Sequence, residues 1–155
     1  MGLRRRAREA ALQVLYLLEF HQGLDRDRSI QDFWERFHAP DDIKEYAHVL
    51  LHGVLRYQSE IDHAIARSAN RWRINRVSLV DRNILRLAIY EMHYEQDVPQ
   101  KVAINEAIEI SKNFSQPSAA AFINGVLDRI MREGIVPTDV LRPAENPRTR
   151  GGRSN

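Results

Sequence analysis

The sequence predicts an all-α protein, a compact bundle of about six helices. Apolar residues recur at intervals of three and four along most of the 155-residue chain, the spacing of amphipathic helices. No segment of the sequence shows the strict alternation of apolar and polar residues that is typical of a half-buried strand. Proline, glycine and polar residues separate the periodic segments by short connections, so neighbouring helices are expected to pack antiparallel.

Length and composition favour one domain with its own core. Hydrophobic residues make up 43% of the chain and charged residues 28%, and both values are ordinary for a globular protein. The sequence has no cysteine, which excludes disulfides and thiolate metal sites. It also has no apolar run long enough to cross a bilayer. We therefore expect a cytoplasmic protein that does not associate with membranes.

Positive charge is concentrated at the two ends of the chain. Residues 1–8 carry four arginines and no acidic residue, and residues 137–155 carry a net charge of +2. The whole chain also has a net charge of +2, which leaves −4 for residues 9–136. This distribution suits an N-terminal arm that meets a polyanion and a body that receives a basic protein.

The first periodic segment predicts a helix from Leu3 to about Phe20. Its four arginines lie in the first two turns, where positive charge opposes the helix macrodipole. An external anionic partner would account for them, and the alternative is a solvated, frayed N-terminus. Arginine rather than lysine favours nucleic acid, because the guanidinium binds phosphate bidentately and stacks on bases. The apolar positions of this helix form one stripe: Ala7, Ala11, Val14, Leu15 and Leu18.

Two helices are expected next. Ser29, with Asp32 three residues later, resembles a capping box and predicts a short helix that runs to His38. The apolar register then continues unbroken from residue 43 to residue 65. This predicts one helix of about 25 residues that begins near Asp42, despite the cost of Gly53 in its interior.

The most apolar helix is expected in the middle of the bundle. A basic loop over 70–76 leads to Ser78 and Asp81, which predict a helix start, and the helix runs to about Tyr94. Its apolar residues lie on nearly all faces, which is typical of a central helix.

The segment 102–127 predicts two helices joined at Ser115-Gln116-Pro117, with Ser118 placed to cap the second. Beyond Gly134 the periodicity ends. We expect one domain over 1–136 and a disordered basic tail over 137–155. The apolar stripe of the first helix of the pair comprises Ala103, Ala107, Ile110 and Phe114. That of the second comprises Ala119, Phe122, Ile123, Val126, Leu127, Ile130 and Met131.

The sequence offers no catalytic constellation, which favours a binding protein over an enzyme. It has no glycine-rich phosphate loop, nucleophile elbow or serine-lysine motif. His48 and His52 share a helical side with Glu45, but packed or solvated histidines are the more common reading of such a pattern. Glu106 and Glu109 are read as a solvated helix face. We expect no cofactor and no metal.

Several blocks of the sequence together carry a family resemblance. They begin with RRRARE at 4–9, ALQ at 11–13 and LY at 15–16, and continue with LxGV at 51–54, Asp62 and DRxILRLAIYE at 81–91. VAINEA at 102–107 and FINGVLD at 122–128 close the series and are its most specific part. In this order, over residues 4 to about 132, the chain resembles the NusB family of transcription antitermination proteins.

The resemblance implies an all-helical fold of two three-helix subdomains. It also implies a function, since NusB-like proteins bind the single-stranded boxA element of ribosomal RNA leader transcripts. They do so with the ribosomal protein NusE, within an antitermination complex on RNA polymerase. An arginine-rich arm and exposed aromatic rings are the side chains that single-stranded RNA requires.

The resemblance assigns RNA contacts to the arginine cluster and to an aromatic residue of the first helix. Arg4, Arg5, Arg6 and Arg8 match the family's arginine-rich motif, and Tyr16 matches its helix-one tyrosine. For Tyr16, a partly buried amphipathic ring is an equally good reading.

Three further residues are assigned from the second half of the chain. Ser118 aligns with an acidic position that is linked to RNA binding in some relatives, and a helix cap is its alternative role. Phe122 corresponds to an aromatic residue at the family's RNA surface, although its periodicity points it at the core. Asp81 matches a position used against NusE, and a capping box is its alternative.

Two other functions compete with this one. The first is a protein-interaction bundle that binds NusE or polymerase without touching RNA. The second is the RNA-binding domain of a ribosomal RNA cytosine methyltransferase, which has the same fold. Such an enzyme requires a further catalytic domain with a cofactor loop and cysteines, and the sequence shows neither, so this function is rejected unless the chain is a fragment. A homodimer that hides the arginine surface is a further possibility that the sequence does not decide.

Overall fold

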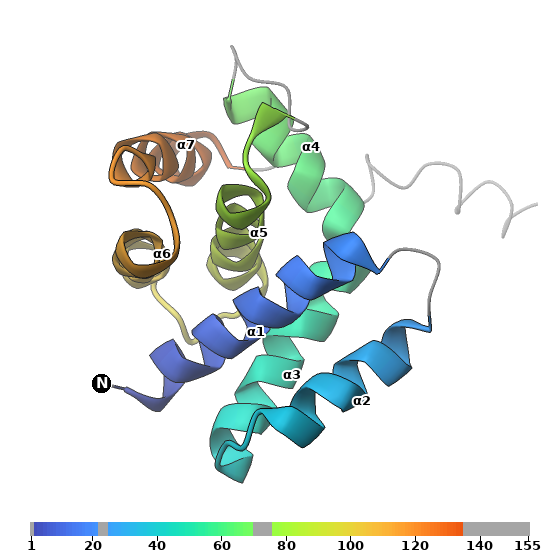
Figure 1. Ribbon diagram of the computed structural model, residues 1–155. Coiled ribbons are helices and arrows are strands. Elements are labelled where there is room, and N and C mark those ends of the chain that lie inside the picture. The colour runs from blue at the N-terminus through green and yellow to red at the C-terminus, as the bar shows by residue number, and fades with distance from the viewer. Residues whose placement is uncertain (1, 22–24, 70–75, 135–155) are drawn as a thin grey trace, which may run out of the picture.

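The computed structural model describes residues 2–21, 25–69 and 76–134, and these ranges contain seven helices and no strand (Figure 1). The all-α prediction is confirmed. The helices are α1 (Leu3–Phe20), α2 (Arg26–Arg36), α3 (Asp41–Arg56), α4 (Gln58–Ser68), α5 (Leu79–Tyr94), α6 (Gln100–Phe114) and α7 (Ala119–Glu133).

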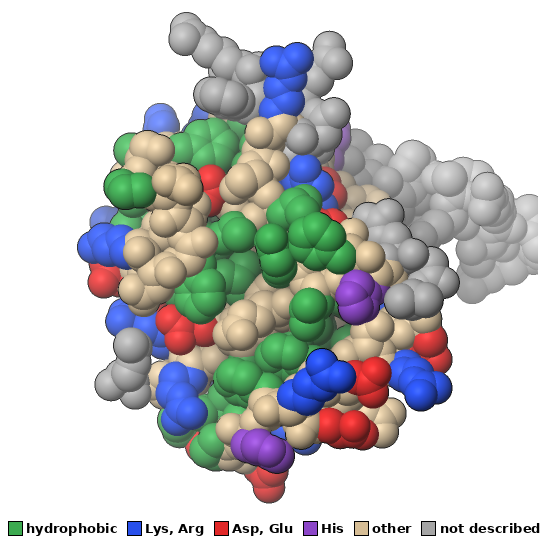
Figure 2. Space-filling model, viewed as in Figure 1, with side chains coloured by type: hydrophobic (Ala, Val, Ile, Leu, Met, Phe, Trp, Pro, Cys, Tyr) green, Lys and Arg blue, Asp and Glu red, His purple; other side chains and the backbone are tan. Residues whose placement is uncertain are grey.

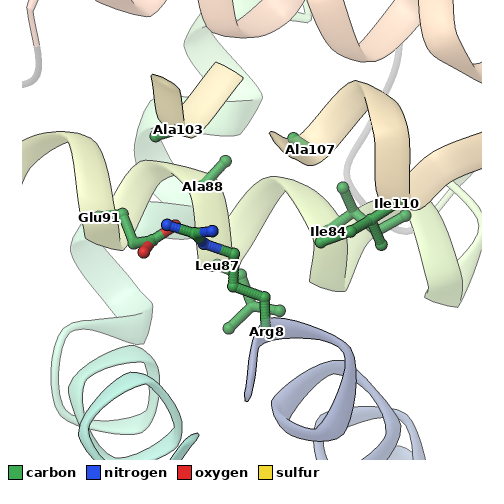
Figure 3. Close-up of a pocket in the computed structure, with 8 residues that line it drawn as sticks. All are labelled: Arg8, Ile84, Leu87, Ala88, Glu91, Ala103, Ala107 and Ile110. Carbon is green, nitrogen blue, oxygen red and sulfur yellow. The ribbon is translucent and has the colours of Figure 1, made fainter. Parts of the chain in front are cut away.

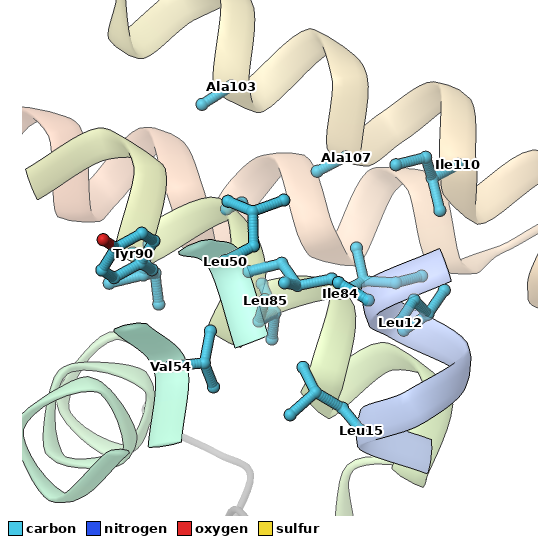
Figure 4. Packing of buried hydrophobic residues seen from close by; sticks show 14 of the residues in the cluster. Leu12, Leu15, Leu50, Val54, Ile84, Leu85, Tyr90, Ala103, Ala107 and Ile110 are labelled. Carbon is cyan, nitrogen blue, oxygen red and sulfur yellow. The ribbon is translucent and has the colours of Figure 1, made fainter. Parts of the chain in front are cut away.

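Helix α5 is the centre of the bundle, as its apolar faces predict. It packs against α1, α3, α4, α6 and α7. Every residue from 83 to 92 is buried. Figure 4 shows Ile84 and Leu85 of α5 among the alanines of α6 and the leucines of α1 and α3. The helices form two groups, with α1 packed on α2 and α3, and α6 and α7 packed on α5 and on each other.

The long helix expected over 42–65 is instead two helices that meet at Tyr57, so this prediction was wrong. Tyr57 leaves helical geometry, with φ −104° and ψ 18°, and its ring stacks on Tyr94 of α5 with centroids 4.1 Å apart. One turn earlier, Gly53 lies directly against Tyr90, because a Cβ on Gly53 would come within 2.1 Å of that ring. Contacts with α5 therefore explain both the break and the glycine.

One helix start and one helix cap also differ from the prediction. Helix α2 begins at Arg26 rather than at Ser29, because the carboxylate of Asp25 caps it and accepts the backbone N–H groups of Asp27 and Arg28. The side chain of Ser118 makes no cap hydrogen bond at α7, where the Ala119 N–H instead donates to the Gln116 carbonyl.

The remaining boundaries agree with the sequence. Helix α1 has the expected ends, Ser78 caps α5 by accepting the Asp81 N–H at 3.1 Å, and residues 115–118 separate α6 from α7. Phe114 is a correction, because it is exposed at the end of the α6 stripe rather than buried. Most of the predicted basic loop (70–75) and the predicted tail (137–155) lie outside the described residues.

Candidate nucleic-acid interface

The arginine cluster at the start of α1 is divided between the surface and the interior. Arg4 and Arg6 are exposed, Arg5 is partly exposed, and Arg8 is buried with 5% of its surface accessible. Arg6 has no hydrogen-bond or ion-pair partner for its guanidinium among the described residues. The four side chains therefore differ in what they offer to an external anion.

Arg8 points into the bundle and pairs with two acidic residues. Its Nε donates to Oε1 of Glu91 on α5 at 2.8 Å, and its Nη1 donates to Oε1 of Glu106 on α6 at 3.2 Å. Figure 3 shows the Arg8 side chain reaching from α1 to Glu91, below Ala103 and Ala107 of α6. The second oxygen of Glu91 accepts the hydroxyl of Tyr46 at 2.5 Å. The fold thus holds Arg8 as a buried, fully paired charge.

Arg5 is also held by Glu106, at the edge of the same network. Its Nε and Nη2 donate to the two carboxylate oxygens of Glu106 at 2.8 and 2.6 Å. The expectation of a solvated Glu106 was wrong, because only 17% of its side-chain surface is exposed. The hydrogen bond from Arg5 lowers the pKa of Glu106, so this carboxylate is charged at neutral pH.

Arg4 makes looser contacts at the protein surface. Its Nη2 lies 2.9 Å from Oδ2 of Asp97, and both side chains are exposed. Its guanidinium carbon lies 4.5 Å from the centroid of the Tyr46 ring. An exposed pair of this kind is worth little and exchanges readily with other partners. Arg4 is therefore available to a phosphate at small cost.

Tyr16 lies on an exposed apolar surface near the other end of α1. Its side chain is 38% exposed and meets Phe20 edge-to-face, with ring centroids 5.0 Å apart. Figure 2 shows apolar side chains gathered across the middle of the face on which α1 lies. Tyr16 also lines a cavity of about 300 Å³ whose other lining residues are Leu12, Gln13, Leu17, Phe33, Val80 and Phe114.

The three site residues predicted from the second half of the chain come together around one pocket. Asp81, Ser118 and Phe122 all line a cavity of about 370 Å³ between the start of α5 and the connection from α6 to α7. Asp81 accepts the hydroxyl of Ser115 at 2.5 Å, so it also ties that connection to α5. Ser118 is exposed, whereas Phe122 is half-buried against the core and still reaches the pocket.

Glu91 and Glu106, the acidic partners of the arginines, were not predicted from the sequence. Glu91 carried a signal, since a carboxylate on a helix that is apolar all round must find a partner when it is buried. Glu106 carried none, because it is partly exposed and reaches Arg5 across about 100 residues of sequence.

The described ranges hold no group of three or more side chains that could ligate a metal, and the rings of His48 and His52 stack 5.6 Å apart. No helix in those ranges is long and apolar enough to span a bilayer.

The sequence and the fold both match known proteins. The NusB family model matches residues 5–132. The transcription antitermination protein NusB of Thermodesulfovibrio yellowstonii is 43% identical over 141 residues, with 85% of this chain and 93% of that protein covered. A structure of T. maritima NusB has a TM-score of 0.75 and 37% identity, with 84% and 91% of the two chains covered. A structure of the antitermination factors NusB and NusE in complex with dsRNA has a TM-score of 0.73 and 28% identity, with 85% and 98% covered.

Proposed function

The chain belongs to the NusB family, and we propose that it binds the single-stranded boxA element of ribosomal RNA leader transcripts together with NusE. In this proposal the two proteins and the RNA act within an antitermination complex on RNA polymerase. A relative of this chain has been captured with NusE and RNA, which supports both partners. The chain acts by binding and carries out no chemical step.

The observation that carries the proposal is the pair of exposed arginines on α1, a helix that is packed against α3 and α5. Arg4 and Arg6 are two positions apart, so they project from α1 at about 200° to each other. An RNA strand that crosses the N-terminal end of α1 can contact both arginines. Because α1 is already ordered, these contacts do not require the backbone to lose freedom on binding.

The aromatic and polar pockets extend this surface. Glu106 pairs with Arg5, and Phe114 lines the same cavity as Tyr16. These two residues are eight positions apart on α6, which is about 12 Å along the helix axis. We assign base stacking to Tyr16 and Phe122, since unpaired bases stack on exposed rings. Ser118 is assigned to the RNA at the adjoining pocket, and Asp81 to NusE.

A salt titration tests the proposal. A labelled boxA RNA is titrated with the protein, with and without NusE, at several salt concentrations. Each phosphate neutralised on a single strand contributes about −0.7 to the slope of log K against log[salt]. Contacts from Arg4 and Arg6 therefore predict a slope of about −1.4. R6A should reduce it to about −0.7 and leave the binding of NusE unchanged.

The competing function predicts a different outcome. A protein-interaction bundle would bind NusE fully while neither mixture bound RNA, and that result would refute the RNA proposal. A duplex of the same sequence serves as the second probe, because the related complex contains dsRNA. Tighter binding of the duplex than of the single strand would contradict the assignment of stacking to Tyr16 and Phe122. Sedimentation of the free protein tests the possible homodimer.

A further inference from the structure

Two carboxylates balance two of the four arginines before any ligand arrives. Arg5 and Arg8 donate to Glu106, and Arg8 also donates to Glu91, so the four charges sum to zero. The sequence assigned RNA contacts to Arg5 and Arg8, whereas the two carboxylates that hold them, Glu91 and Glu106, were assigned no role. The place of this network beneath the arginine arm raises the question of what it does to the binding of an anion.

The two ends of the network differ in accessibility. Arg8 and Glu91 have side chains that are 7% and 2% exposed, so an incoming phosphate does not reach them. Arg5 and Glu106 are 28% and 17% exposed and lie at the edge of the network. Only the pair of Arg5 with Glu106 can therefore exchange one anion for another.

Arg5 also occupies the position on α1 that an RNA strand would cross between Arg4 and Arg6. At about 100° per residue it lies midway between Arg4 and Arg6 around the helix. A strand that meets both exposed arginines consequently passes over Arg5, whose guanidinium is occupied by the Glu106 carboxylate. That carboxylate also repels the approaching phosphates.

We propose that Glu106 is an internal competitor of RNA, which holds Arg5 through a bidentate hydrogen-bonded pair and keeps it from phosphate. The inference rests on the proposed RNA function. Glu106 thereby limits the affinity of the arm, and Glu91 keeps Arg8 as a structural anchor of α1. Loss of the Glu106 charge releases Arg5 as a third phosphate contact.

The experiment compares E106Q with E109Q in the same salt titration of single-stranded boxA RNA. Both variants remove one negative charge from α6. Glu109 pairs with Lys112 of its own helix at 2.7 Å and acts on Arg5 through its charge, so E109Q controls for the loss of a charge near Arg5. We expect E106Q to steepen the slope from about −1.4 to about −2.1 and to bind several-fold more tightly at low salt. E109Q should leave the slope unchanged. Equal changes in the two variants, or weaker binding by E106Q, would overturn the proposal.

A double-mutant cycle links the effect to Arg5. In the R5A background, E106Q should no longer steepen the slope, since no guanidinium remains to be released. If the gain persists there, the competition is not for Arg5. If wild type, E106Q and E109Q all fail to bind RNA, the proposed function itself is wrong, which is a distinct result.

A measurement on the wild-type protein tests the same proposal without relying on the folding of any variant. The Nε–H signals of Arg5 and Arg8 are followed by NMR while boxA RNA is added. Competition predicts that the Arg5 signal moves as Arg5 leaves Glu106, while the Arg8 signal stays in place. A stationary Arg5 signal in the RNA-bound protein would refute the release of Arg5.

Discussion

The clearest consequence of the divided arginine cluster concerns the stability of R8M. The substitution leaves Glu91 buried, with the hydroxyl of Tyr46 as its remaining partner. Removal of one member of a buried ion pair costs about 3–5 kcal/mol, because the other charge stays uncompensated. That is a large share of the roughly 5–15 kcal/mol by which a domain is stable. For a chain of this length it lowers the melting temperature by about 10 °C.

Urea unfolding followed by circular dichroism measures this loss. R6A is the matched control, because it removes an exposed arginine from the same helix and is expected to change the unfolding free energy by less than about 0.5 kcal/mol. The double variant R8M/E91L should recover much of the loss, since it removes both buried charges. At temperatures where R8M is folded, its salt slope for RNA should equal that of wild type. Wild-type stability in R8M, or a slope reduced as in R6A, would refute the structural role of Arg8.

Two further predictions concern packing and pH. G53A should destabilise the protein by about 1–3 kcal/mol, because the added methyl group meets the Tyr90 ring. G125A adds a Cβ that has nothing within 4 Å, so it should stabilise α7 by about 0.5–1 kcal/mol. Thermal unfolding of both variants decides this, and an equal effect would contradict the close approach. The folded state lowers the pKa of Glu106, so its contribution to stability is present above pH 4.5, its ordinary value, and is lost as pH falls towards the folded pKa. E106Q should therefore show a shallower loss of unfolding free energy below pH 4.5, and an unchanged pH dependence would argue against the pair with Arg5.

The sequence predicted the helices whose ends are set by local chemistry. Ser78 caps α5 as expected, and Ser115-Gln116-Pro117 marks the turn between α6 and α7. The break at Tyr57 was not predictable in this way, because its apolar register continues across residue 57. The ring that it stacks on, Tyr94, lies 37 residues further along the chain. Only the packed bundle brings them together.

The division of the arginine cluster into buried and exposed side chains was not predicted, because the cluster was treated as a run rather than as positions on a helix. Arg8 lies three, four and seven residues before Ala11, Leu12 and Leu15, which places it on the edge of the apolar stripe of α1. Arg6 lies about 160° from Arg8 around the helix. Helical position alone therefore separates the buried arginine from the exposed one. The identities of Glu91 and Glu106 as partners required the fold.

The separation of the four arginines into exposed and internally paired side chains has a consequence for how a NusB protein of this kind would bind RNA in a complex. If only Arg4 and Arg6 meet phosphates, the electrostatic contribution to RNA binding is small and easily screened by salt. A second protein that holds the same RNA raises the effective concentration of the strand at α1, and avidity then exceeds either affinity alone. Under the proposed function, an arm that is half neutralised by its own fold would favour binding of RNA jointly with NusE over binding to any polyanion. On this reasoning E106Q should gain affinity for unrelated single strands as well as for boxA, because a phosphate contact carries no sequence information.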